Sequence, residues 1–278
     1  MRTRISWVLT AVVLAVSSHA GAQSINGCGG GSGLQVVGLT DDQRLICFRE
    51  NNAGQARTIG RISGLTGDGE LVGIDYRPAT GELWGLGDEG GLYVIDTRDG
   101  DATFKSQLNV DLTGDSFGVD FNPTVDRLRV ISDSGQNLRI NVDTGAVTTD
   151  TALAYPPDGA TGVTGAAYTN NDAKANTGTT LYVIDSRLDQ VTIQAPPNNG
   201  SLNAVGKLTL DASSDVGFDI YSRLDGGSTV DVHAFASLLS GDRARFYKVN
   251  LFTGRAWMRG NFKAQDRVID IAIPTRQR

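Results

Sequence analysis

Apolar and polar residues alternate along most of the chain in short runs that are separated by glycine-rich turns. This period of two predicts β-strands with at least one buried face. Residues 70–111 illustrate the pattern, with strands predicted at 71–77, 82–86, 92–97 and 102–110. Apolar positions with a helical period of useful length are absent after the first 22 residues. We therefore predict an all-β protein.

One motif recurs along these strands: glycine, an apolar residue, aspartate and another apolar residue. Its copies are Gly73–Tyr76, Gly118–Phe121, Gly165–Tyr168, Gly217–Ile220 and a degraded Val268–Ile271. By subtraction, their first residues lie 45, 47, 52 and 51 positions apart. A period of about 45–50 residues with four short strands per unit is typical of a β-propeller blade.

The two ends of the chain complement each other. The last copy has no strands after it, and the N-terminal segment has three predicted strands, at 34–39, 44–48 and 56–62, with no motif strand before them. Joining them completes a blade and leaves no open sheet edge. We predict a single β-propeller domain over residues 23–278, with five four-stranded blades and a one-plus-three closure by the C-terminal strand. The blades cover residues 34–66 plus 267–274, 70–111, 116–155, 163–210 and 215–263.

The first 22 residues form a segment of another kind. Two arginines precede an uncharged run of twelve residues, Ile5 to Val16, and Ala20-Gly21-Ala22 follows. This order is typical of a secretory signal peptide, and twelve residues are too few to span a bilayer. We predict a protein without a membrane span that is exported to the periplasm or the extracellular space.

The net charge restricts the classes of partner, and the two cysteines indicate a disulfide. Without the signal peptide the chain has 23 basic residues (25 − 2) against 31 acidic ones, a net charge of −8. Nucleic acids and anionic membranes attract clustered lysine and arginine, so neither is an expected partner. Export permits a disulfide, and neither a Cys-x-x-Cys spacing nor a nearby histidine supports a redox or metal role. We predict a disulfide between Cys28 and Cys47.

Several phrases within the blades resemble a known protein family. They are GVDFNPTVDRLRVISDSGQNLR, TGAAYTNN, TTLYVIDS and APPNNGSLNAVG. Over about residues 34–273 the chain resembles the bacterial family named domain of unknown function 4394. The resemblance implies a secreted, propeller-like domain and brings no activity, cofactor or catalytic residue with it.

The motif aspartates are the main candidates for a site. Innermost strands line the channel of a propeller, so we expect four carboxylates around the axis: Asp75, Asp120, Asp219 and Asp270. They suit three roles: acceptors for backbone N–H groups of the next blade, oxygen ligands for Ca²⁺, or the acid pair of a glycosidase. Recurrence favours the first role, because catalytic acids differ in role and environment. Ala167 replaces the aspartate in the fourth copy.

Other polar residues provide further candidates. The loop and strand-end amides Asn122, Gln136 and Asn137 suit either a ligand or the turns themselves. Glu70, just before an innermost strand, is a candidate general acid. His233 is the only histidine after the signal peptide, which argues against a histidine-based metal site, and no Gly-x-Ser-x-Gly sequence supports a catalytic triad.

These observations predict a secreted, non-catalytic binding module that meets its ligand at one end of the channel. The expected partner is an unknown extracellular or envelope ligand: a glycan, a peptide or an envelope protein. The alternative is a hydrolase of the glycosidase or lactonase type that uses the channel carboxylates, with Ca²⁺ as the candidate cofactor. We assign no catalytic residue and no metal ligand, and we expect a monomer.

Overall fold

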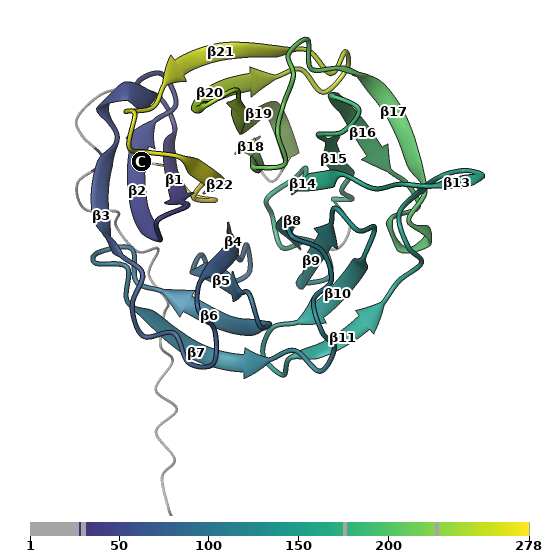
Figure 1. Cartoon of the computed structure of the whole chain (residues 1–278), viewed down its shortest axis with the longest axis horizontal. Coiled ribbons are helices and arrows are strands. Elements are labelled where there is room, and N and C mark those ends of the chain that lie inside the picture. Colours follow the sequence, from purple (N-terminus) through teal and green to yellow (C-terminus); the bar gives the residue numbers. More distant parts are fainter. Residues whose placement is uncertain (1–27, 29–31, 175–176, 226–227, 278) are drawn as a thin grey trace, which may run out of the picture.

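The computed structural model describes residue 28 and residues 32–174, 177–225 and 228–277 of the chain. Its strands form five four-stranded antiparallel sheets arranged as blades around one axis (Figure 1). The predicted all-β, five-bladed propeller is confirmed. The predicted signal peptide, residues 1–22, lies outside the described residues.

The first blade closes the ring as the sequence predicts. The C-terminal strand β22 is its innermost strand and pairs antiparallel with β1, next to which β2 and β3 follow. From the axis outward the blade contains β22 (Val268–Ala272), β1 (Gln35–Thr40), β2 (Arg44–Arg49) and β3 (Arg57–Arg61). Because its strands come from both ends of the chain, this sheet holds the ring together.

The other blades each consist of four consecutive strands, the first of which lies at the axis. Blade 2 contains β4 (Leu71–Tyr76), β5 (Leu83–Gly87), β6 (Gly91–Ile95) and β7 (Ala102–Gln107). Blade 3 contains β8 (Phe117–Asn122), β9 (Arg127–Ser132), β10 (Asn137–Asn141) and β11 (Ala146–Thr149). Blade 4 contains β14 (Val163–Tyr168), β15 (Leu181–Asp185), β16 (Gln190–Gln194) and β17 (Leu202–Lys207). Blade 5 contains β18 (Val216–Asp225), β19 (Ser228–Ser240), β20 (Arg243–Val249) and β21 (Ala256–Asn261).

Three features interrupt the regular order of the blades. A small hairpin, β12 (Ala154–Tyr155) with β13 (Asp158–Gly159), lies between blades 3 and 4. Two 3₁₀ turns occur within the described residues, η1 (Ala53–Gln55) and η2 (Pro197–Asn199). In blade 5, β18 and β19 continue as a paired hairpin beyond Ala234, the last β19 residue that still pairs with β20.

The motif glycines allow innermost strands of neighbouring blades to pack directly against each other. A Cβ atom at Gly118 would lie 2.7 Å from the backbone nitrogen of Ala166 in the next blade. A Cβ atom at Gly217 would lie 2.6 Å from the Cα atom of Asp270. Real Cβ atoms do not approach backbone this closely, so the glycine of the motif is required by strand-to-strand contact at the axis.

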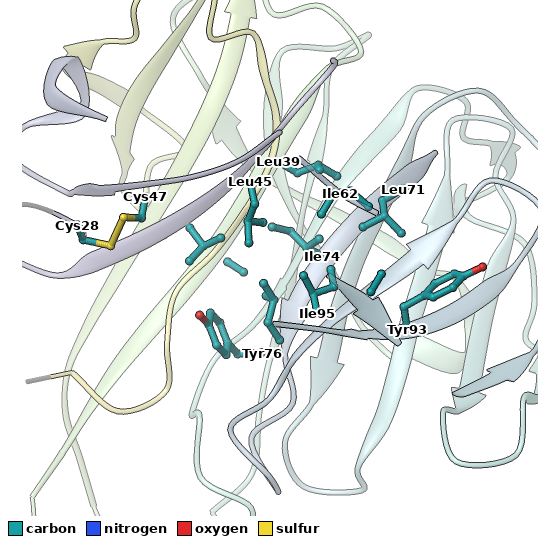
Figure 2. Close-up of a cluster of buried hydrophobic side chains, with 14 residues drawn as sticks. Cys28, Leu39, Leu45, Cys47, Ile62, Leu71, Ile74, Tyr76, Tyr93 and Ile95 are labelled. Atoms are coloured by element: carbon teal, nitrogen blue, oxygen red, sulfur yellow. A yellow bond between two sulfur atoms is a disulfide. The ribbon is translucent and has the colours of Figure 1, made fainter. Parts of the chain in front are cut away.

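Five buried apolar clusters fill the five gaps between blades. The cluster between blades 1 and 2, for example, joins Leu39 and Leu45 to Ile74 and Tyr93 (Figure 2). Equivalent clusters occupy the other four interfaces. Both faces of each blade are therefore buried against a neighbour, which explains why the strands carry apolar residues on both sides.

The predicted disulfide between Cys28 and Cys47 is confirmed. It lies at the edge of the cluster between blades 1 and 2 and ties the segment before β1 to β2 (Figure 2). Among the described residues there is no helix long and apolar enough to cross a membrane.

We expect the double substitution Cys28→Ser/Cys47→Ser to lower the free energy of unfolding by about 3 kcal/mol, because the bond restricts a loop of about 20 residues in the unfolded chain. Urea unfolding of parent and variant measures the difference. Dithiothreitol should destabilise the parent to the same extent and leave the variant unchanged. Equal stability of the oxidised parent and the variant would contradict this prediction.

Candidate functional site

The motif aspartates, here called the aspartate ring (Asp75, Asp120, Asp219 and Asp270), join successive innermost segments. Each carboxylate accepts a hydrogen bond from a backbone N–H of the next blade. The donors are Phe121 to Asp75 (2.7 Å), Tyr168 to Asp120 (3.1 Å), Ile273 to Asp219 (2.5 Å) and Ile74 to Asp270 (2.8 Å). Three of the four also accept the N–H of the following residue in their own strand: Tyr76, Ile220 and Ile271.

Blades 4 and 5 are joined in another way, because Ala167 replaces the aspartate there. The hydroxyl of Ser222 accepts a hydrogen bond from the backbone N–H of Asn170 (2.8 Å), and the Ser222 N–H donates to Oδ1 of Asn171 (2.7 Å). Ser222 lies beyond the motif in β18. The junction that lacks an aspartate is thus held by a reciprocal pair of bonds nearer the end of the inner strands.

The ring carboxylates are close together and buried. Oxygens of Asp75, Asp120 and Asp219 lie within 4.8 Å of one another, and every member of the ring is at most 6% exposed. Burial raises the pKa of all four groups; in Asp75, Asp120 and Asp270 the neighbouring carboxylates raise it further. Burial raises the pKa of Asp219 to about 7. At neutral pH the ring therefore retains protons that ordinary aspartates have lost.

The geometry of the ring limits its chemistry. Two carboxylates about 5 Å apart suit a retaining glycosidase, but a substrate must reach them. Here backbone N–H groups already occupy ring oxygens, and exposure is minimal. The three oxygens of Asp75, Asp120 and Asp219 do form a donor set of the kind that Ca²⁺ and Mg²⁺ prefer.

The three predicted amide candidates lie in separate environments. Gln136 donates to the carbonyl of Asp111 and accepts the N–H of Thr113. Asn137 is buried and bonded to Arg129 and Gln194. Asn122 accepts from the backbone and hydroxyl of Thr124, at the opposite end of β8–β9. The structure does not bring Asn122 together with the other two amides.

A pocket of about 270 Å³ opens where several innermost strands begin. We call it the mouth pocket. Its polar lining consists of four carboxylates, one guanidinium and two hydroxyls, and its apolar lining includes Phe117 and Ile269. The polar residues are Asp41, Glu70, Asp115, Asp215, Arg267, Ser116 and Ser214.

Charge is unevenly distributed in the mouth pocket. Arg267 forms an ion pair with Asp215 (2.5 Å) and lies 3.8 Å from Asp41. Among the described residues nothing pairs with the carboxylates of Glu70 and Asp115, which come from blades 2 and 3. One side of the pocket thus carries two uncompensated negative charges.

Sequence reasoning identified Glu70 and missed the rest of the mouth pocket. A signal for it does exist: Glu70, Asp115 and Asp215 each stand two or three residues before a motif glycine. The repeat therefore carries two acidic positions, one within the innermost strand and one before it. Only the second position is solvent-accessible.

We expect the stability of the protein to be greatest near pH 4–5. The unfolded chain loses its aspartate protons at about pH 4, whereas folding raises the pKa of Asp219 to about 7 and also raises the pKa values of Asp75, Asp120 and Asp270, so the free energy of unfolding falls as pH rises above about 4. Below about pH 4 stability falls again, because arginine ion pairs lower the pKa of Asp42, Asp96, Asp143 and Asp150. Thermal unfolding from pH 3 to pH 9 measures the loss of stability on both sides of this maximum.

The same series with Ca²⁺ and with a chelator is the control. Equal curves are expected if protons, not a cation, neutralise the ring. A Ca²⁺-dependent gain of stability at neutral pH would contradict proton retention and show that a cation compensates the carboxylates.

Two asparagine variants should separate the members of the ring. Asp75 accepts backbone N–H groups at both oxygens, so in Asp75→Asn the amide NH₂ faces a donor; we expect a lower melting temperature at every pH. Asp120 accepts one bond, so Asp120→Asn keeps its acceptor and removes a charge. We expect Asp120→Asn to weaken the loss of stability between pH 4 and pH 7. Equal melting temperatures of the two variants at every pH would contradict this distinction.

Comparison with known proteins identifies structures of similar fold and the family of the chain. No curated protein matches the chain. A protein of unknown function from Bacteroides thetaiotaomicron is 12% identical, with 86% of this chain and 62% of that chain covered and a TM-score of 0.46. An auxiliary nutrient binding protein from the same organism is 11% identical, with 90% and 63% covered and a TM-score of 0.46.

A protein from Lactobacillus plantarum is 10% identical, with 87% of this chain and 99% of that chain covered and a TM-score of 0.42. The chain spans less than two thirds of the length of the two Bacteroides proteins. Similarity at this level carries no information on function. The family model described as Domain of unknown function (DUF4394) matches residues 44–272 and confirms the resemblance of the repeated phrases. Since this match extends through all five blades, the chain belongs to the DUF4394 family.

Proposed function

We propose that this protein is an exported, non-catalytic binding module that holds a cationic group of its ligand in the mouth pocket. One observation carries the proposal: the carboxylates of Glu70 and Asp115 are exposed within a cavity of about 270 Å³, and no residue of the described ranges pairs with them. Paired with a ligand cation, they would gain charge-assisted hydrogen bonds that no described residue of the protein supplies.

The mouth pocket is preferred to the aspartate ring on grounds of access. Ring carboxylates are buried and bonded to backbone, so a ligand would have to break the contacts between blades to reach them. Glu70 and Asp115 lie on segments that precede inner strands, and no described residue bonds to their carboxylates. Binding there leaves the propeller intact.

The pocket chemistry favours a peptide or an envelope protein as partner. Its volume suits one long side chain, its carboxylates suit an ammonium or guanidinium group, and Phe117 and Ile269 suit an aliphatic stem. A neutral glycan would use the hydroxyls and carboxylates as hydrogen-bond partners and would gain nothing from the net negative charge. We therefore propose a lysine or arginine side chain as the group that is bound.

Hydrolysis of a glycosidic bond or a lactone is the alternative function. It is favoured by the same two unpaired carboxylates, with Glu70 as general acid and Asp115 as base or nucleophile. Turnover of chromogenic glycosides or lactones by the parent, abolished by Glu70→Gln, would replace the non-catalytic proposal with this one.

Binding of a tetralysine peptide, measured by isothermal titration calorimetry at low salt, tests the proposed function. We expect the double variant Glu70→Gln/Asp115→Asn to weaken binding at least tenfold, because both charges that attract the ammonium groups are removed. A tetraserine peptide should not bind the parent.

Glu82→Gln/Asp158→Asn is the matched control, since it changes the net charge equally at residues outside the mouth pocket. It should bind tetralysine as the parent does. Equal loss of affinity in both double variants would mean that overall charge attracts the peptide, and the proposed site would be wrong. Tight binding of a neutral oligosaccharide in place of tetralysine would overturn the proposed ligand class.

A further inference from the structure

A second cavity, of about 430 Å³, lies between blades 5 and 1 at the end of the molecule opposite the mouth pocket. In blade 1 it is lined by Leu34, just before β1, and Glu50, just after β2, whereas the mouth pocket is lined by Asp41 in the turn between these strands. We call it the rim cavity. It adjoins the base of the long β18–β19 hairpin, where blade 5 departs from the common blade pattern.

His233 holds a lysine at the rim cavity. Its Nε2 lies 3.0 Å from Oδ2 of Asp231 and its Nδ1 lies 3.3 Å from Nζ of Lys248. An ammonium group can only donate, so Nδ1 is the acceptor and the proton of the neutral ring is on Nε2, where it is donated to Asp231. The histidine therefore fixes the position of Lys248 without neutralising its charge.

The ammonium group of Lys248 has N–H donors that the bond to His233 does not use. This group has three N–H donors, and the bond to His233 uses one of them. Throughout the described ranges no carboxylate forms an ion pair with this lysine. Lys248 is only partly exposed, so its remaining donors face a cavity in which bulk water screens the charge less than at an open surface.

Arg259 adds a second set of donors. Its Nη2 pairs with Oε2 of Glu50 at 2.7 Å, which leaves most of the guanidinium N–H groups without a described partner. Gln277, another lining residue, uses its whole amide on the backbone of Gln35 and Pro274. Among the residues that line the cavity, two cations outnumber one carboxylate, so the lining is positive and rich in donors, the reverse of the mouth pocket; Asp231, bound to His233, is outside the lining.

We propose that the rim cavity binds a small organic carboxylate. The two carboxylate oxygens accept hydrogen bonds from Lys248 and Arg259, and the organic part packs against Leu34 and Phe235, the apolar residues of the lining. Inorganic phosphate has no apolar part to cover Leu34 and Phe235, so the apolar lining favours an organic carboxylate over phosphate. The site is separate from the mouth pocket and does not depend on its function.

Isothermal titration of the full-length mature protein with benzoate and, separately, with inorganic phosphate tests this inference. We expect benzoate to bind and phosphate to bind at least tenfold more weakly. Lys248→Met should weaken benzoate binding at least tenfold, because it removes the charge and keeps the aliphatic stem. Lys105→Met, an equal change on the outer strand β7, should leave binding unchanged.

Arg259→Gln provides an independent variant in case Lys248→Met does not fold, as judged by its melting temperature. It should weaken benzoate binding as well, while tetralysine binding at the mouth pocket stays unchanged. The inference is overturned by undetectable benzoate binding to the parent, by phosphate binding more tightly than benzoate, or by parental affinity in the variants at both 248 and 259.

Discussion

The hydrogen bond from a backbone N–H to a motif aspartate of the neighbouring blade is the interaction on which this propeller depends. An innermost strand pairs with one partner in its own sheet, so its other edge faces the channel with backbone groups that no strand satisfies. Unpaired buried N–H groups cost free energy comparable to a lost hydrogen bond. Each ring aspartate supplies an acceptor at this edge. Before Asp75, Asp120 and Asp219 a motif glycine two residues earlier allows the close packing of inner strands; before Asp270 this position is Val268.

This solution has an electrostatic cost. It places four carboxylates in a channel so narrow that β18 contacts β8 across it, and their burial raises their pKa values. One of the five junctions has no aspartate and is held through Ser222 instead, which limits the number of charges in the channel. The charges that remain are balanced by retained protons or by a cation, and both hold the ring groups in place. In either case the role of the aspartate ring at the centre of the molecule is structural.

Charged groups that a ligand can reach are consequently found at the two ends of the channel: carboxylates in the mouth pocket and cations in the rim cavity. Three of the four mouth carboxylates precede inner strands; Asp215 is bound by Arg267 of blade 1, whereas Glu70 and Asp115 have no partner among the described residues. At the other end, Lys248 and Arg259 face a cavity beside the hairpin that only blade 5 extends, as far as the described residues show. The mouth pocket thus depends on the acidic residues that precede three of the motif glycines, and the rim cavity on a hairpin that extends beyond the common blade pattern. A propeller with such ends can bind two unlike ligands without rearranging its blades.

The amino-acid sequence determined the architecture, because its physical causes are local. Strand alternation, the glycine turns and the spacing of the motif are properties of neighbouring residues, and they led to five blades, the closure by 268–272 and the pairing of Cys28 with Cys47. Even the bonding role of the aspartates followed from their recurrence. Only the tertiary structure decided which polar residues face solvent and which meet. Glu70 and Asp115 occupy equivalent positions of the repeat, 45 residues apart, whereas no pattern relates Leu34 to Lys248, and the repeat alone does not show which of these residues share a cavity. Their proximity results from how blades pack around the axis, which depends on contacts between all five sheets at once.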